Sequence, residues 1–185
     1  MTIRHKFRAM LVAAAVMAIP CQAMAGGTAL HYPVIKQFGG AYALTNAAEQ
    51  PDPNKAYKVI FDVTKGAPKP SKVNAGLFHV AKAVNIMTTA GVPLSNLHFV
   101  AVLHGKATVA VLDNAHYKAK FGINNPNIPL FKALREAGVR VDVCGQSMLK
   151  EHYQLDWANR YVTPALSALS TLIIYGNQGY AYVKQ

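Results

Sequence analysis

The chain has 185 residues, of which 19 are basic and 8 acidic, and its formal net charge at pH 7 is +11. This length leaves room for one ordinary domain with a sizeable core, and a second domain would not fit comfortably. Lysine and arginine are scattered along the chain instead of clustered, which argues against a nucleic-acid-binding protein and indicates a solvated basic surface.

The first 25 residues have the pattern of a secretory signal peptide. Arg4, Lys6 and Arg8 precede an apolar run, and Pro20 and an Ala-Met-Ala sequence at 23–25 follow it. Cleavage is therefore expected after residue 25. The apolar run is about half the roughly 20 residues that a membrane-spanning helix needs.

Cys21 raises the alternative of a lipidated N-terminus. Pro20 stands where a lipoprotein signal has a small residue, so we expect a periplasmic protein without a stable membrane anchor. The leader holds three of the nineteen basic residues and none of the acidic ones, so its removal lowers the net charge from +11 to +8.

Removal of the leader leaves Cys144 as the only cysteine. Exported domains commonly use cysteines in pairs, and a single cysteine cannot form an internal disulfide. Cys144 is therefore a buried residue of the hydrophobic core, one half of an intermolecular disulfide, or a reactive thiol.

Residues 26–56 are interpreted as an N-terminal extension, rich in Gly, Pro, Ala and Asn. The stretch 49–55 is typical of a loop, and a short ordered piece is expected around 32–44. The domain itself is predicted to cover residues 57–185.

The first half of this domain alternates between strand and helix patterns. A β-branched run at 57–64 predicts a strand, and apolar residues at helical spacing predict a helix over 71–89 that Gly91 ends. A longer, almost unbroken apolar run at 96–105 predicts a strand covered on both faces, as in parallel sheets. The pattern that follows, from 106, is ambiguous between helix and strand.

The second half continues the alternation. The stretch 122–129 predicts a loop, 130–138 a helix closed by Gly138, and 139–145 a third strand. The order helix, glycine, strand is typical of a layered α/β protein.

The tail predicts a short strand at 160–163, a helix over 165–173 with Pro164 at its first turn, and a fifth strand at 180–184. The predicted fold is a single three-layer α/β/α sandwich with a mostly parallel five-stranded sheet.

Three polar residues follow predicted strands. Asp62, His104 and Cys144 come at the ends of the first, second and third, and the carboxyl ends of parallel strands are where ligands bind. His104 is a candidate base or orienting group for the thiol, or a structural histidine, and Asp62 a ligand contact or a partner of a loop amide. We expect all three at one edge of the sheet.

The residues after Cys144 suit a reactive thiol. Gly145 permits a tight turn, and Ser147 is a candidate cap for a short helix near 148–153. The start of a helix favours an anion, and the thiolate is the form that attacks sulfur. Free cysteine is also among the most buried residue types, so the pattern alone leaves the reactive and the buried interpretations open.

Other classes of site lack their usual signatures. The histidines have no tight metal-ligand spacing, and there is no GxGxxG, Walker loop or GxSxG. We expect no metal and no cofactor.

Several segments carry a family resemblance. They are His-Gly-Lys-Ala at 104–107, Gly-Ile-Asn-Asn-Pro-Asn at 122–127, the helix, glycine and strand run at 133–147 and the tail segments 165–169 and 179–184. Over about 57–184 the chain resembles the DsrE/DsrF-like sulfur-relay family. The resemblance implies a parallel five-stranded sheet between helices and assembly into trimers or hexamers.

The resemblance also implies a role for the site. The family's cysteine in this motif, here Cys144, accepts and donates a sulfane sulfur as a persulfide, and His104 falls in the family's His-Gly turn. The loop containing Asn125 is expected to close over the pocket. Substrate contacts are predicted for Asp62, Asn125, Gly145, Gln146 and Ser147.

We therefore expect an exported sulfur-handling protein that binds sulfane sulfur on Cys144 and relays it to a partner protein. Whether it acts as a sulfurtransferase or as a carrier stays open. Sulfur-relay members of the family are cytoplasmic, so an exported member needs a different donor and acceptor. The alternative is a non-catalytic oligomeric module that binds a small anionic ligand or a protein partner, with Cys144 buried.

Overall fold

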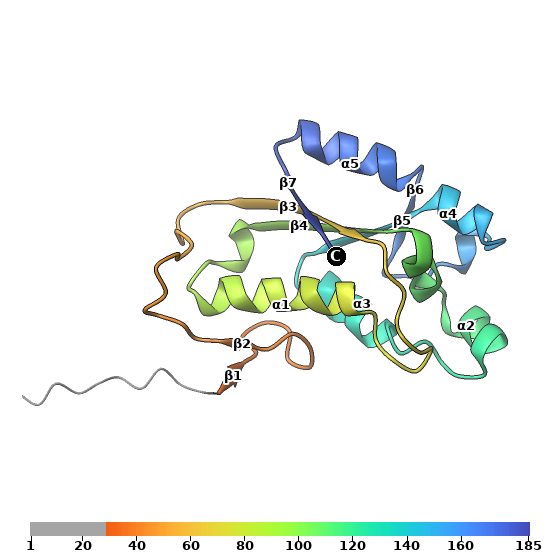
Figure 1. The fold of residues 1–185 in the computed structure, drawn as a ribbon, viewed down its shortest axis with the longest axis horizontal. Coiled ribbons are helices and arrows are strands. Elements are labelled where there is room, and N and C mark those ends of the chain that lie inside the picture. Colours follow the sequence, from red (N-terminus) through yellow and green to blue (C-terminus); the bar gives the residue numbers. More distant parts are fainter. Residues whose placement is uncertain (1–28) are drawn as a thin grey trace, which may run out of the picture.

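Short runs of β-branched and aromatic residues form the strands at the centre of the fold. The computed structural model describes residues 29–185, so the predicted signal peptide and Cys21 lie outside the described residues. The central strands are β3 Tyr57–Val63, β4 Leu97–Leu103, β5 Arg140–Cys144, β6 Thr163–Ala165 and β7 Ala181–Lys184. They form one parallel sheet in the order β6-β5-β4-β3-β7 (Figure 1).

Helices connect the strands and cover the sheet. They are α1 Ala75–Thr89, α2 Asn114–Phe121, α3 Ile128–Glu136, α4 Gly145–Lys150 and α5 Ala168–Asn177, with 3₁₀ helices η1 Leu94–Asn96, η2 Gly105–Val111 and η3 Leu155–Trp157. Within residues 29–185, none of these helices combines the length and the apolar character that crossing a membrane requires.

The sheet has two apolar faces because successive side chains of a strand point to opposite sides. Phe61 and Val63 belong to the large core that packs under α1 and α3, whereas Ile60 and Val102 belong to a smaller cluster under α5. Figure 1 shows α1 and α3 below the sheet and α5 above it. The predicted three-layer α/β/α sandwich is confirmed.

The segment whose pattern is ambiguous is helical. It forms η2 and then α2, and Asp113 caps α2 by accepting a hydrogen bond from the backbone N–H of His116 at 2.8 Å. Gly122 ends α2 with a φ of +77°, a left-handed conformation that glycine adopts without strain.

In the C-terminal part of the chain, the boundary between β6 and α5 differs from the prediction. Pro164, predicted in the first turn of the helix, is instead a residue of β6 and is paired with Val143. β6 is an edge strand, where proline is tolerated because an edge offers positions whose N–H has no strand partner. The helix begins only at Ala168, after Ser167, whose Oγ accepts from the backbone N–H of Ser170 at 2.9 Å.

The N-terminal extension packs against α1. It contains a small antiparallel pair, β1 Leu30–His31 with β2 Ala41–Tyr42. The buried amide of Asn85 on α1 binds it: Oδ1 accepts from the backbone N–H of Ile35, and Nδ2 donates to the Ile35 carbonyl, both at 3.0 Å. A polar side chain in the core of α1 thus anchors this part of the chain.

Candidate functional site

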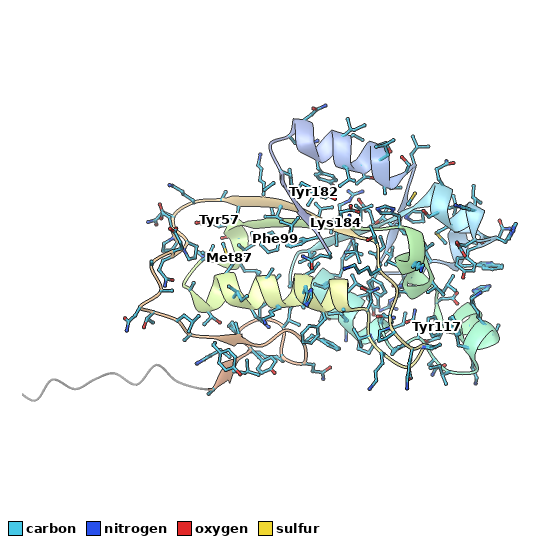
Figure 2. All side chains as sticks on the ribbon, in the orientation of Figure 1. Tyr57, Met87, Phe99, Tyr117, Tyr182 and Lys184 are labelled. Carbon is cyan, nitrogen blue, oxygen red and sulfur yellow. The ribbon has the colours of Figure 1, made fainter. Side chains whose placement is uncertain are left out.

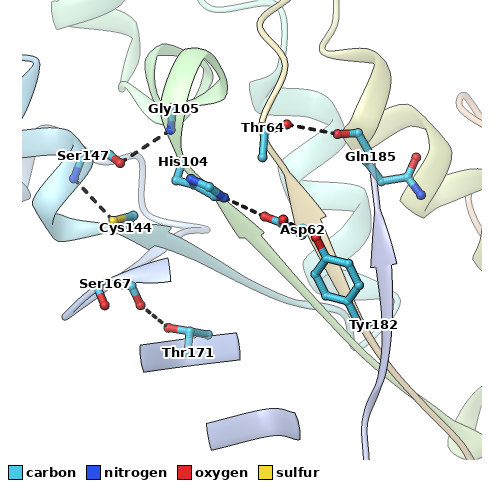
Figure 3. A network of polar contacts seen from close by, with 10 residues as sticks. All are labelled: Asp62, Thr64, His104, Gly105, Cys144, Ser147, Ser167, Thr171, Tyr182 and Gln185. Atoms are coloured by element: carbon cyan, nitrogen blue, oxygen red, sulfur yellow. Dashed lines mark hydrogen bonds and ion pairs between the residues drawn. The ribbon is translucent and has the colours of Figure 1, made fainter. Parts of the chain in front are cut away.

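The carboxyl edge of the sheet brings the three strand-end residues onto one face. Leu103 of β4 is paired with Val143 of β5. The residues that follow are His104 and Cys144, which therefore stand beside each other on strands about 4.8 Å apart. By the alternation of side chains both face α5, as Asp62 of β3 does, and Figure 3 shows His104 between Cys144 and Asp62.

Asp62 holds His104 and is itself held by a tyrosine. Nε2 of His104 lies 2.6 Å from Oδ1 of Asp62, and the hydroxyl of Tyr182 donates to Oδ2 at 2.7 Å. Asp62 is buried, whereas the His104 side chain is 31% exposed. Tyr182 lies on β7 and points to the α5 side of the sheet (Figure 2). Its hydrogen bond to Asp62 raises the pKa of the Tyr182 hydroxyl above its ordinary value.

Cys144 is the last residue of β5 and also the cap of α4. Its Sγ accepts a hydrogen bond from the backbone N–H of Ser147 at 3.4 Å, so the structure has Cys144 at the cap position that we predicted for Ser147. The Oγ of Ser147 in turn accepts from the N–H of Gly105 at 3.5 Å, which links the cysteine turn to the His104 turn. Cys144 is only 5% exposed, and Gln146 beside it is exposed.

Gly145 allows the turn after Cys144 to fit against the edge strand. A Cβ atom at this position would lie 2.7 Å from the backbone oxygen of Ala165 in β6, closer than a carbon and an oxygen can approach without a backbone shift. The glycine is therefore needed for close packing, and the predicted substrate contact would come from its backbone.

Asn125 is buried in the loop between α2 and α3, and its side chain is hydrogen-bonded to other protein groups. Nδ2 donates to the carbonyls of Ala110 and Leu112 at 2.8 and 2.6 Å, and Oδ1 accepts from the backbone and side chain of Asn127, both at 2.9 Å. These bonds shape the loop between α2 and α3, and the substrate contact of Asn125 stays a prediction.

The most pronounced hollows of residues 29–185 are not lined by Asp62, His104 or Cys144. A groove of about 670 Å³ runs between residues 41–51 of the N-terminal extension and the end of α1, on the opposite face of the sheet. Among residues 29–185, no group of three or more His, Cys, Asp and Glu side chains is arranged to hold a metal ion.

A comparison with protein families decides the family of the chain. The model of the DsrE/DsrF-like family matches residues 58–184. The chain belongs to the DsrE/DsrF-like family. Family membership points to a sulfur-relay role, and it agrees with the resemblance seen in the sequence.

Solved structures add support for the fold. This DsrE/DsrF-like chain is similar to a protein of unknown function from Methanobacterium thermoautotrophicum, with a TM-score of 0.50 and 16% sequence identity, over 70% of this chain and 99% of that one. At this identity the likeness supports the fold alone. Among curated proteins no match is found.

Sequence reasoning missed Tyr182 as part of the site. Its contact with Asp62 joins residues 120 positions apart, across the β3–β7 pairing that places the last strand beside the first strand of the domain. Had that pairing been known, the alternation of β7 would have put Tyr182 on the same face as Asp62.

Proposed function

We propose that this DsrE/DsrF-like protein is exported to the periplasm, where Cys144 binds sulfane sulfur as a persulfide and passes it to a partner protein. One observation carries the proposal: the only cysteine of the described residues stands beside His104, and His104 is held from its other side by Asp62. A thiol next to an oriented histidine is the arrangement of an activated sulfur nucleophile.

The reaction that this arrangement allows is an exchange of sulfur between a persulfide and a thiol, and it needs no oxidant. The proton of the Cys144 thiol passes to His104, and the thiolate attacks the terminal sulfur of a donor persulfide. The new Sγ–S bond forms as the donor S–S bond breaks, and the donor thiolate leaves with the electron pair and takes the proton. Release repeats the exchange, with an acceptor thiol as nucleophile and Cys144 as leaving group.

The hydrogen bond from the Ser147 N–H stabilises the sulfur of Cys144 when it carries negative charge. A thiolate and a persulfide anion are both better acceptors than a neutral thiol, so this bond strengthens in the forms that react. Gly105, whose N–H binds Ser147, keeps the turn in place.

The export part of the proposal rests on the sequence of residues 1–25. Mass spectrometry of the protein purified from the periplasmic fraction would test it, and the expected N-terminus is residue 26. A product that begins at residue 1, or at Cys21 with acyl chains, would contradict it.

The test of the sulfur-binding part is the intact mass of the native protein after incubation with polysulfide. We expect an increase of about 32 Da, one sulfur atom, that a reductant removes. Cys144→Ser is the control and should show no such increase. An unchanged mass of the wild type, or the same adduct on the variant, would overturn the proposal.

The burial of Cys144 favours a second candidate function, a non-catalytic module that binds a small anionic ligand or a protein partner. Titration of the native protein with a thiol reagent separates the two. Slow labelling that becomes fast only after denaturation supports the module, whereas fast labelling near neutral pH supports the sulfur carrier.

We also propose that the protein forms a homo-oligomer, a trimer or a hexamer. Support comes from large apolar side chains on α5 and just before its start, four of which are more than half exposed. We call this set the α5 outer face: it consists of Leu166, which precedes the helix, and of Leu169, Ile173 and Ile174 within it. Contiguous apolar surface of this kind is typical of a contact between proteins.

A further inference from the structure

We infer that Tyr182 is a positioning residue of the site. Together with Asp62 it keeps His104 in the tautomer that has its proton on Nε2, so that Nδ1 is free to act as the base. The catalytic consequence rests on the proposed function of Cys144, whereas the hydrogen bonds themselves do not.

The two bonds to Asp62 determine where the proton of His104 lies. The Tyr182 hydroxyl donates to Oδ2 of Asp62. An ionised carboxylate can only accept hydrogen bonds, so its Oδ1 must receive the proton on Nε2 of His104, 2.6 Å away. A neutral imidazole carries one N–H, which leaves the lone pair on Nδ1.

The last strand and the residue that follows it hold Asp62 at two points. Tyr182 is paired with Ile60 in the sheet, and its ring reaches forward to the side chain of Asp62 on the same face. The backbone N–H of Gln185 donates to the carbonyl of Asp62 at 2.9 Å. The torsion that turns a carboxylate is soft, and the second partner on Oδ2 limits its rotation.

This arrangement gives each group one task during sulfur transfer. Nδ1 of His104 receives the Cys144 proton, and the imidazolium that forms keeps its Nε2–H on Asp62, whose negative charge compensates the new positive one. The same proton then passes to the departing donor thiolate, which returns His104 to its starting tautomer. Tyr182 touches neither sulfur nor donor and acts through Asp62 alone.

The tautomer can be measured without any activity. Two-bond ¹H–¹⁵N correlation spectra of the native protein, at a pH above the ordinary range of histidine titration, distinguish a protonated Nε2 from a protonated Nδ1. The signal of His104 is assigned by its loss in His104→Gln. We expect the Nε2–H form in the wild type and a mixture of tautomers in Tyr182→Phe.

The rate of Cys144 persulfide formation provides the second measurement. We expect about a tenfold loss in Tyr182→Phe, which lacks only the hydroxyl. Asp62→Asn should lose about 100-fold or more, because an amide can donate to Nε2 and drive the proton onto Nδ1. Tyr180→Phe is the matched control, since Tyr180 packs edge-on against Tyr175, and its rate should equal that of the wild type.

The outcomes separate this inference from the proposed function. A wild-type His104 with its proton on Nδ1, or a Tyr182→Phe protein with unchanged spectrum and unchanged rate, would overturn the inference. An Nε2–H form that is lost in Tyr182→Phe supports it even if no persulfide forms, and in that case only the proposed function fails.

Discussion

Cys144 depends for its position on the small residue that follows it. Because a side chain at Gly145 would collide with the backbone oxygen of Ala165 at 2.7 Å, we expect Gly145→Ala to lower the free energy of unfolding by about 1–3 kcal/mol. The same change should alter the labelling rate of Cys144, since relief of the clash moves the start of α4.

Gly176→Ala provides the control for this prediction. Gly176 lies in α5, and a Cβ there meets no atom within 4 Å. Alanine should therefore raise the stability by about 0.5–1 kcal/mol, as expected inside a helix. Urea unfolding of both variants measures the two effects, and a destabilisation of equal size in both would contradict the packing role of Gly145.

Histidine 104 offers a second prediction at the level of single residues. His104→Gln keeps a polar side chain that can bind Asp62 but removes the base, so the rate of persulfide formation should fall about 100-fold. Stopped-flow measurement with polysulfide tests this. Unfolding by urea should stay within about 1 kcal/mol of the wild type, because the side chain is partly exposed.

Asp113 carries a prediction at the level of the helix. It caps α2 and binds both the backbone N–H and the ring Nδ1 of His116, each at 2.8 Å. Burial by itself raises the pKa of Asp113, but the hydrogen bonds from His116 outweigh it, and the pKa lies below its ordinary value. The ionised cap is therefore worth more in the folded protein than in the unfolded chain.

The sign of the pH dependence follows from this lowered pKa. The contribution of Asp113 is fully present above about pH 4, the ordinary range of aspartate, and is lost as the pH falls through the lower folded value. Asp113→Ala should cost about 1 kcal/mol at neutral pH. Thermal unfolding across pH 2–7 checks it: the cost should shrink in acid, and a cost that is constant over this range would contradict the account.

The sequence predicts best the elements whose apolar residues recur with one clear spacing, either that of a helix or that of a strand. The strands from Tyr57 and Leu97 and the helix ending at Thr89 are found close to where the pattern places them, because their apolar residues meet one core. The prediction that Pro164 lies in the first turn of a helix is wrong. Proline suits both a first helical turn and an edge strand, and only the pairing with Val143 decides between the two positions.

The site too is predictable only in part, because some of its contacts depend on how distant segments of the chain pack together. Asp62, His104 and Cys144 are found together because they end neighbouring parallel strands, and a run of residues shows where a strand ends. The contact of Tyr182 with Asp62 depends on strand order across 120 residues, which no local pattern encodes. The burial of Asn125 depends on the packing of the surrounding loops, which no local pattern encodes either.

At the scale of the whole molecule, the α5 outer face leaves large apolar side chains exposed to solvent. Leu169 and Ile173 fit the helical period that predicted this element, yet they are 70% and 56% exposed, and Leu172 packs on the sheet. A helix that is apolar on both sides needs cover on both sides, and a second copy of the chain can supply it.

Oligomerisation can therefore be tested by placing charged side chains on the α5 outer face. We expect sedimentation analysis of the wild type to give a multiple of the chain mass, and Leu169→Glu combined with Ile173→Lys to give the monomer. Phe78→Glu on α1 is the control, because Phe78 is 38% exposed on the opposite side of the sheet. A monomeric wild type, or a variant of unchanged mass, would contradict this role of the α5 outer face.

The most direct measurement of sulfur carriage follows one sample through a full cycle. The native protein is loaded with polysulfide, freed of excess donor, and mixed with a small acceptor thiol while intact mass is recorded at each stage. The account predicts a gain of about 32 Da on loading, its disappearance on addition of the acceptor, and recovery of the sulfur in the acceptor fraction, all absent in Cys144→Ser. A wild-type protein that gains no mass, or that keeps the sulfur in the presence of the acceptor, would contradict it.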